Sequence, residues 1–308
     1  MLRALNTGVT GIRQFQTNLD TIGNNLANVS TIGYKAGRVE FADTLNQTLR
    51  AGTPDAGASR SGTASVQVGN GVEVSSVRNL FTQGAVTQTG VTTDMAISGE
   101  GFFIVKSSSG EFFATRAGSF RVDSSGFLVT DQGFRVQGFS AATAAVGTAY
   151  ADTDSQGDIK LDKPTTLPTG LGTGAATAGV QNISIDGSGN INMLLSDGSQ
   201  FVRGKILLQR FSNPNALLKQ GNSLFSGLTV SGPLTTPTAT NAFGATPTTN
   251  SATSNGLGRI ESGALEMSNV DIAREFSNMI TTQRAFQANA RVVTTSDNIL
   301  QEIVQLVR

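Results

Sequence analysis

The chain has 308 residues, enough for two or three domains with buried cores, and its 22 basic and 22 acidic residues leave no formal net charge. Charged residues are only 14% of the chain, so neither a nucleic acid nor an anionic membrane surface is indicated as a partner. Cysteine and histidine are both absent, which excludes disulfides, thiolate catalysis and the commonest general base and metal ligand. We therefore expect a non-enzymatic protein without a cofactor.

The chain opens with a helical pattern that we expect to run from Leu2 to about Ala27. Its apolar residues recur at four-three spacing, which is the heptad pattern of a helix that packs on another helix. Gly8, Gly11 and Gly23 each weaken the helix by about 1 kcal/mol relative to Ala, so the helix is expected to need a partner. The seam consists of Leu2, Leu5, Val9, Ile12, Leu19, Ile22, Leu26 and Val29, with Phe15 alongside.

This first helix does not resemble a secretory signal. Arg3 and Arg13 are spread along an amphipathic pattern and do not precede an apolar run with a small-residue cleavage site. No apolar run approaches the roughly 20 residues of a membrane span. We expect a protein that is either cytoplasmic or exported without a cleaved leader.

The middle of the chain is rich in Gly, Ser and Thr and alternates apolar and polar residues over short stretches. Asn70-Gly71, between two alternating stretches, predicts a hairpin, and Ser124-Ser125-Gly126 predicts another. Short strands at about ten-residue spacing are typical of an antiparallel sandwich or barrel. Residues 140–178 are expected to form a short outer insertion, and residues 231–255 to be poorly ordered unless they pack.

A long helix is expected from Asp271 to Arg308, again with a heptad seam. The seam consists of Phe276, Met279, Phe286, Ala290, Val293, Leu300, Val304 and Val307, with Gln283 and Asp297 at its two polar positions. Further apolar residues widen the stripe beyond what one partner helix covers, namely Ile280, Ile299, Ile303 and Leu306. Packing among several copies of the chain would cover them, and the polar positions would then select one helix register.

These elements predict an α+β multidomain fold. Paired N- and C-terminal coiled-coil helices are expected to carry one or more antiparallel β-rich domains inserted between them. The expected parts are a helical core domain (1–30 and 268–308), a connecting segment (31–65 and 256–267), a β-rich domain (66–139 and 179–255) and the insertion (140–178).

No stretch indicates a catalytic or ligand-binding site. The glycine pairs at 69–71 and 99–101 do not precede a helix with phosphate-loop spacing. The aspartates at 123, 131, 186 and 197 lie at expected turns, where backbone hydrogen bonding explains them. No spacing of acidic residues indicates a metal site.

Several stretches, taken together and in order, resemble the bacterial flagellar rod and hook proteins. They are the runs 24–35 (NNLANVSTIGYK), 94–103 (DMAISGEGFF), 115–120 (TRAGSF), 266–271 (EMSNVD) and 283–290 (QRAFQANA). The positions that carry the resemblance are Asn24, Asn25, Asn28, Gly33, Tyr34, Gly101, Phe102, Phe103, Ser268, Asn269, Arg284 and Asn289.

The resemblance implies a self-assembling axial protein whose terminal helices line an inner tube and whose β domains form the wall. Its termini would be disordered in the monomer and become ordered on assembly. We expect the subunit of the flagellar hook, a hollow, curved tube that serves as universal joint between the rod with its motor and the filament, and as export channel. The alternative in the same family is the distal rod protein; the alternative of another class is a surface glycan-binding β protein.

Partners follow from the same resemblance. They are further copies of the chain, the distal rod, the hook–filament junction protein, the hook cap and the type III export apparatus, with no nucleic acid and no membrane insertion. The expected location is extracellular, in the flagellar basal body and hook. Removal of the last ten residues is expected to abolish assembly of a polymer and to leave a glycan-binding protein unaffected.

Overall fold

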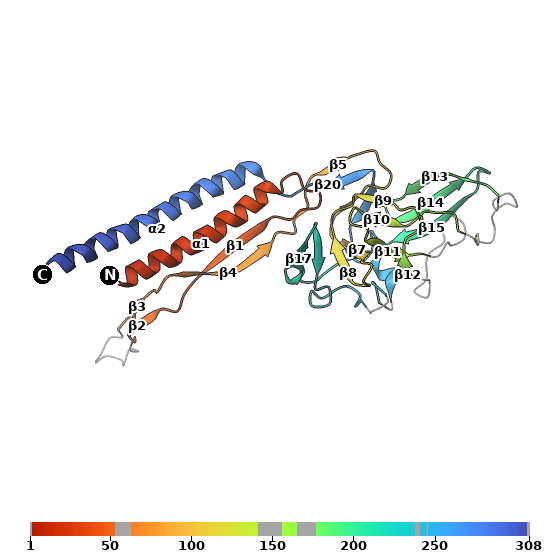
Figure 1. The fold of residues 1–308 in the computed structure, drawn as a ribbon. Coiled ribbons are helices and arrows are strands. Elements are labelled where there is room, and N and C mark those ends of the chain that lie inside the picture. Colours follow the sequence, from red (N-terminus) through yellow and green to blue (C-terminus); the bar gives the residue numbers. More distant parts are fainter. Residues whose placement is uncertain are drawn as a thin grey trace. The chain divides into compact units, whose positions relative to one another are not determined.

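The structure is a computed structural model that describes residues 2–52, 63–140, 156–164, 177–237, 241–244 and 246–306 (Figure 1). The chain divides into two compact units. The helical unit comprises Met1–Val29, Ala36–Leu80 and Val270–Arg308, and the β unit comprises Ser30–Lys35 and Phe81–Asn269. These boundaries differ from the expected ones, because residues 36–80 group with the helices and residues 256–267 group with the β unit.

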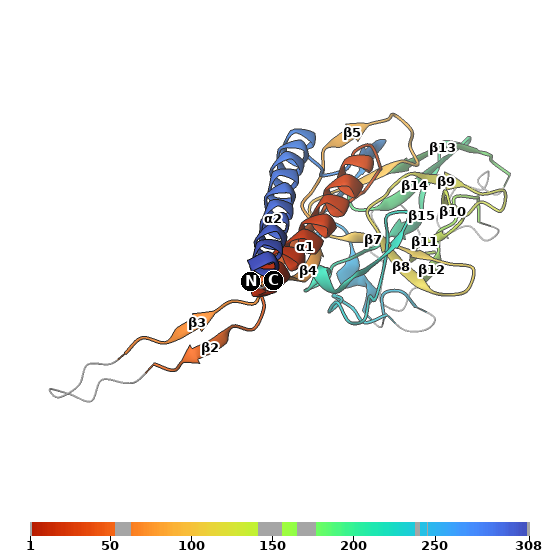
Figure 2. The same cartoon turned by 60° about the vertical axis from the view of Figure 1, so that its left-hand side comes forward.

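The helical unit contains the two expected helices, α1 (Leu2–Ala27) and α2 (Ile272–Leu306). Asp271 begins α2 as its N-cap, since its Oδ1 accepts hydrogen bonds from the backbone N–H groups of Ala273 (3.0 Å) and Arg274 (3.2 Å). The helices lie side by side and run in opposite directions (Figures 1 and 2). Among the described residues, neither helix is apolar enough over a sufficient length to cross a membrane.

A two-stranded ribbon completes the helical unit. β1 (Gly37–Asp43) pairs with β4 (Val72–Asn79), and farther out β2 (Gln47–Arg50) pairs with β3 (Val66–Val68) (Figure 2). The hairpin predicted at Asn70-Gly71 is therefore wrong.

Those two residues lie within one arm of the ribbon, between β3 and β4. Asn70 Nδ2 donates to the carbonyl of Leu45 (2.8 Å), and the Gly71 carbonyl accepts from the backbone N–H of Thr44 (3.1 Å), both on the opposite arm. An Asn-Gly pair can thus mark a break within a strand as well as a turn, because both features need the positive φ that Gly71 adopts (124°).

The β unit is built on a twelve-stranded antiparallel sheet, counted over the described residues. Its central order is β13-β14-β15-β11-β7-β8-β18-β17, and β9, β10, β12 and β16 pair at its sides. Two further pairs, β19–β6 and β20–β5, lie outside it. The bounds are β5 Val86–Gln88, β6 Met95–Ser98, β7 Phe102–Lys106, β8 Phe112–Thr115, β9 Phe120–Val122, β10 Leu128–Thr130, β11 Arg135–Phe139, β12 Gln156–Asp158, β13 Val180–Ile185, β14 Asn190–Leu195, β15 Gln200–Ile206, β16 Leu208–Gln209, β17 Leu218–Gly221, β18 Leu224–Ser226, β19 Arg259–Ser262 and β20 Ala264–Glu266, with short 3-10 helices at Pro214–Ala216 and Pro247–Asn250.

Strand β7 is buried on both faces, which explains its continuous apolar sequence. Phe103 and Val105 point into one core cluster, and Phe102 and Ile104 point into another. The antiparallel β domain between terminal helices confirms the coarse fold class, whereas supercoiling of the helices remains a prediction.

The Thr-rich stretch at 231–255 packs where the structure describes it. Phe243 is fully buried in the cluster that contains Phe102 and Ile104. Asn250 Nδ2 donates to the Leu208 carbonyl (2.8 Å), and Thr235 Oγ1 donates to Asn250 Oδ1 (2.8 Å). Buried polar groups that bond one another explain how so polar a stretch can cover a core.

The predicted hairpin at Ser124-Ser125-Gly126 is confirmed, with β9 pairing β10 around it. Much of the expected insertion at 140–178 lies outside the described residues. Its described part, 156–164, joins the sheet through β12, which pairs with β11, and through Ile159, which is fully buried.

Candidate functional site

The contact between α1 and α2 is lined by small and polar residues. A Cβ atom at Gly11 would lie 2.7 Å from Asn289 Nδ2, so a side chain there would have to displace the Asn289 amide. Seven residues farther along α1, Asn18 Nδ2 donates to Thr282 Oγ1 (3.1 Å). Seven more residues along, Asn25 Nδ2 lies 3.4 Å from Glu275 Oε2. The paired positions step by seven in opposite directions along the two helices, which is an antiparallel heptad register.

The expected α1 seam lies at or beside this contact. Ile22 is buried, and the other described seam residues are half-buried: Leu5, Val9, Ile12, Phe15, Leu19 and Leu26. The α1 seam is therefore only partly covered in the single chain.

One of the two rows of the expected α2 seam keeps its place, and the other is displaced by one residue. The row Met279, Phe286, Val293 and Leu300 is half-buried, as a seam requires. The second row that contacts α1 is Glu275, Thr282, Asn289 and Ser296, each one position before Phe276, Gln283, Ala290 and Asp297. Gln283 and Asp297 are exposed and lie outside the α1 contact, where Asp297 Oδ2 accepts from Gln301 (2.9 Å).

The displaced row leaves the face of α2 with Phe276, Ile280 and Val304 exposed in the single chain. Phe276 is 47% exposed, Ile280 50% and Val304 64%. Val292 and Ile299, on the other side of the helix contact, and Ile272 and Ile303, near the ends of α2, are exposed as well. Large apolar side chains on one long helix are typical of a surface that another protein surface covers.

The asparagines at the end of α1 bond to the ribbon and to α2. Asn25 is buried, its Oδ1 accepts from the Gly37 N–H (2.9 Å), and its Nδ2 donates to the Gly37 carbonyl (2.8 Å). Asn28 Nδ2 donates to the carbonyl of Asn24 (2.9 Å) and to its Oδ1 (3.0 Å). Through the contact with Glu275, the Asn25 amide also bonds to the neighbouring helix.

In the β unit, three charged side chains form a buried ion cluster. Lys35 Nζ lies 2.6 Å from Glu266 Oε1, and Arg116 Nη1 lies 3.2 Å from Glu266 Oε2. The side chains of Lys35 and Glu266 are fully buried, and that of Arg116 is 5% exposed. Lys35 also donates to the carbonyl of Thr82 (2.7 Å), and Arg116 Nη2 to that of Gly99 (2.9 Å).

Burial sets the electrostatics of this cluster. Loss of water around the ammonium lowers the pKa of Lys35, and the carboxylate of Glu266 opposes that shift. Burial likewise lowers the pKa of Arg116, against the attraction of Glu266. The Arg116 guanidinium lies 5.1 Å from the Phe102 ring centroid, and its Nε is buried with no hydrogen-bond partner. Removing one charge from such a cluster costs far more than the intact cluster contributes.

Backbone contacts tie the same segments together. The Gly33 N–H donates to the Glu266 carbonyl (2.8 Å), and a Cβ at Gly33, whose φ is +65°, would lie 2.5 Å from the Ala117 nitrogen. Asn269 Nδ2 donates to Thr82 Oγ1 (2.8 Å). Gly33 is thus required for both its backbone conformation and the close approach.

The remaining motif residues have structural positions. Tyr34 is buried, with Lys219 Nζ 3.6 Å from its ring centroid. Gly101 adopts a φ of +131° directly before the buried Phe102 and Phe103. Ser268 is half-buried and Arg284 is exposed.

The cluster residues Lys35, Arg116 and Glu266 lie within the motifs that carry the resemblance, yet sequence reasoning did not select them. The available signal was the few charged residues in three motifs, one in each of the first two and two, Glu266 and Asp271, in the third. Their pairing across 231 and 150 residues is not visible in any local pattern.

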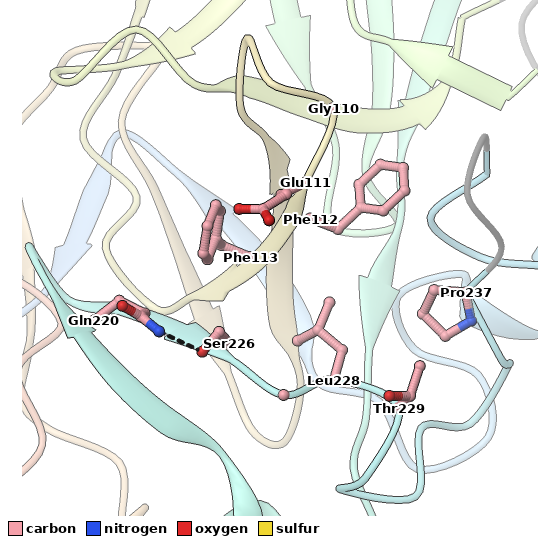
Figure 3. A pocket seen from close by; sticks show the side chains of 10 residues that line it. Gly110, Glu111, Phe112, Phe113, Gln220, Ser226, Leu228, Thr229 and Pro237 are labelled. Carbon is pink, nitrogen blue, oxygen red and sulfur yellow. Dashed lines mark hydrogen bonds between the residues drawn. The ribbon is translucent and has the colours of Figure 1, made fainter.

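A cavity of about 710 Å³ opens beside strand β8 (Figure 3). Glu111 is the only acidic residue among its ten lining residues, and the others that contribute polar side chains are Gln220, Ser226 and Thr229. Gln220 Nε2 donates to Ser226 Oγ (2.8 Å). A single carboxylate does not form the acid–base pair of a glycosidase. Within the described residues, no group of three or more acidic side chains is placed to hold a metal ion.

Comparisons with known proteins place the chain in one family. A family described as "Flagella basal body rod protein" matches residues 5–35. The "Flagellar hook protein FlgE/F/G D1 domain" matches residues 96–193, and the "Flagellar basal body rod FlgEFG protein C-terminal" matches residues 261–306.

Full-length relatives agree with these matches. The flagellar basal-body rod protein FlgG of Bacillus subtilis is 37% identical over 308 residues and covers 100% of both chains. FlgG of Borreliella burgdorferi is 35% identical over 97% of both chains, and the hook protein FlgE of the same species is 30% identical over 99% of this chain and 100% of its own. The Helicobacter pylori hook protein FlgE2 aligns with 67% of this chain and 47% of its own at 12% identity and a TM-score of 0.21, too low to inform on fold. With similarity along its whole length to both rod and hook proteins, the chain belongs to the flagellar rod and hook family of axial structural proteins.

Proposed function

We propose that this chain is a structural subunit of the flagellar rod that assembles with further copies of itself into a hollow helical tube. The exposed apolar face of α2, centred on Phe276, Ile280 and Val304, carries the proposal. Neighbouring subunits would cover this face, so that α1 and α2 pack in a coiled-coil inner tube.

The sequence patterns led us to expect the hook, whereas the comparisons favour the rod. The alignment with the Bacillus subtilis rod protein has the length of this chain, 308 residues. The alignment with the Borreliella burgdorferi hook protein extends over 455 residues, so the hook relative carries a large additional segment. Because this alignment covers 99% of this chain and 100% of the hook protein, the additional segment falls within the aligned range and has no counterpart there in this chain, which supports the rod. The hook, a curved universal joint, becomes the alternative.

In this proposal the protein is not an enzyme and needs no cofactor. It reaches its position through the flagellar type III export apparatus and lies outside the cytoplasmic membrane in the basal body. Its partners are adjoining axial proteins. The seam residues that we propose for self-assembly are those of both helices, including Gln283, which is exposed and therefore available to a neighbouring subunit.

Electron microscopy of the concentrated protein tests the proposal. The native chain is expected to form straight hollow rods; curved tubes would instead favour the hook. Phe276→Asp is expected to block assembly and to leave the β unit folded, because it places a charge on the exposed face of α2. Val122→Asp, at a valine of the β unit with similar exposure (46%), is the matched control and is expected to assemble. Rods formed equally well by Phe276→Asp would contradict the role of this face.

A further inference from the structure

Three segments of the β unit continue directly into the helical unit. Residues 30–35 lie between α1 and β1, Phe81 follows the segment of the ribbon that contains β4, and Glu266 lies six residues before the start of α2. The last turn of α1, the start of β1, the end of β4 and the first turn of α2 are thus covalently close to one of these segments.

The ion cluster joins all three segments. Lys35 Nζ bonds to Glu266 Oε1 (2.6 Å) and to the Thr82 carbonyl (2.7 Å), and the Gly84 N–H donates to Glu266 Oε1 (3.0 Å). Arg116 neutralises the second oxygen of the same carboxylate. One carboxylate with its two cations therefore holds together segments that are far apart in sequence.

The contact shortens the loop between the helices. Along the chain, Ala27 and Ile272 are 245 positions apart. Through the Gly33–Glu266 contact, six positions lead from Ala27 to Gly33 and six from Glu266 to Ile272. Loop-closure probability falls as the three-halves power of loop length, so in a flexible chain closing 12 positions is about 100-fold more probable than closing 245. Because the β unit between the two ends is itself folded, about 100-fold is the upper limit of the effect on helix pairing.

We propose that Lys35, Glu266 and Arg116 form a clamp that closes the chain for the pairing of α1 with α2. The helix seam combines small and polar residues with apolar rows that are only half-buried in the single chain, so this closure adds to the stability of its pairing. Breaking the clamp leaves a buried charge without a partner, and residues 30–35 and 264–269 then separate to hydrate it. The chain ends that lead to α1 and α2 are then no longer held together, while the sheet around β7 keeps its apolar core. The consequence for rod assembly, a raised critical concentration, rests on the proposed function.

The test uses the full-length chain, which has no native cysteine, with Asn18→Cys and Thr282→Cys introduced across the seam. The equilibrium of the disulfide against glutathione measures the effective concentration of the two thiols. Glu266→Gln and the milder Lys35→Met are expected to lower it, by at most about 100-fold. Asp158→Asn, which breaks the partly exposed ion pair with Arg135, is the control and is expected to leave it unchanged.

Hydrogen exchange at the amides of β7 and β8 accompanies the disulfide measurement. Protection of these strands is expected to persist in Lys35→Met and Glu266→Gln. An unchanged disulfide equilibrium would overturn the clamp, and so would loss of β7 protection in both variants, because the cluster would then support the whole β unit. The assay does not require a polymer, so failure of the native chain to form rods would count against the proposed function alone.

Discussion

The two units place their apolar residues in opposite ways. In the β unit, Phe103 is fully buried, and even a lysine is buried where it has partners. In the helical unit, Asn25, Thr282 and Ser296 are buried at the helix contact, while Phe276 is 47% exposed. The β unit therefore has a buried aromatic core of its own, whereas the helical unit in the single chain leaves large apolar side chains of α2 exposed.

The difference has an energetic counterpart. A fully buried aromatic side chain contributes about 1.5–3 kcal/mol through burial, and a neutral hydrogen bond about 0.5–1.5 kcal/mol net. The seam has close approaches at Gly8 and Gly11 and hydrogen bonds at Asn18 and Asn25. It specifies which residues of the two helices face each other more than it stabilises their contact.

The largest expected effect is that of emptying the β core. Phe103→Ala should lower the free energy of unfolding of the β unit by about 3–5 kcal/mol, because the fully buried ring leaves a cavity. Phe276→Ala should change it by less than about 0.5 kcal/mol. Urea unfolding followed by the β signal in circular dichroism measures both. A similar cost for the two phenylalanines would remove the contrast between the units.

A smaller effect tests the closeness of the helices. Gly11→Leu should destabilise the helix pair by about 1–3 kcal/mol, because a Cβ there already lies 2.7 Å from Asn289 Nδ2. Gly23→Leu is the matched control: a Cβ at Gly23 meets nothing within 4 Å, so better helix propensity should stabilise α1 by about 0.5–1 kcal/mol. Hydrogen exchange of α1 amides reports both changes. Equal stabilisation by the two substitutions would show that the helices are farther apart.

The smallest expected effect is a pH dependence in the buried cluster. Burial lowers the pKa of Lys35 in the folded chain below its usual 10.5, so between the two values the unfolded chain binds more protons. The free energy of unfolding of the native chain, relative to Lys35→Met, should therefore rise with pH across that interval and level off above 10.5. Urea unfolding at several alkaline pH values measures the difference. A difference that falls as pH rises would mean that Glu266 outweighs burial.

Local signals in the sequence predicted local structure well. The extent of α1, the start of α2 at Asp271 and the turn at Ser124-Ser125-Gly126 each depend on residues within a few positions of one another. Caps, heptad spacing and turn residues act over that range, which is why they can be read from sequence.

Which residues contact each other over long distances in the sequence could not be predicted in the same way. The four-three pattern of α2 gives its apolar rows, but α1 contacts a row that includes Thr282 and Asn289, one position before Gln283 and Ala290. Nothing in a single sequence says which face serves the chain itself and which serves another molecule. The ion cluster was not predicted for a related reason: Lys35 and Glu266 meet only through the folding of the residues between them.

The antiparallel register of α1 and α2 has a consequence for an assembly of many copies. Each helix carries about half a positive charge at its amino end and half a negative charge at its carboxyl end. At Asn25 and Glu275 the carboxyl end of one helix adjoins the amino end of the other, so the two dipoles oppose each other. Over the length that the two helices share, a stack of subunits that all point the same way therefore accumulates little axial field from their dipoles.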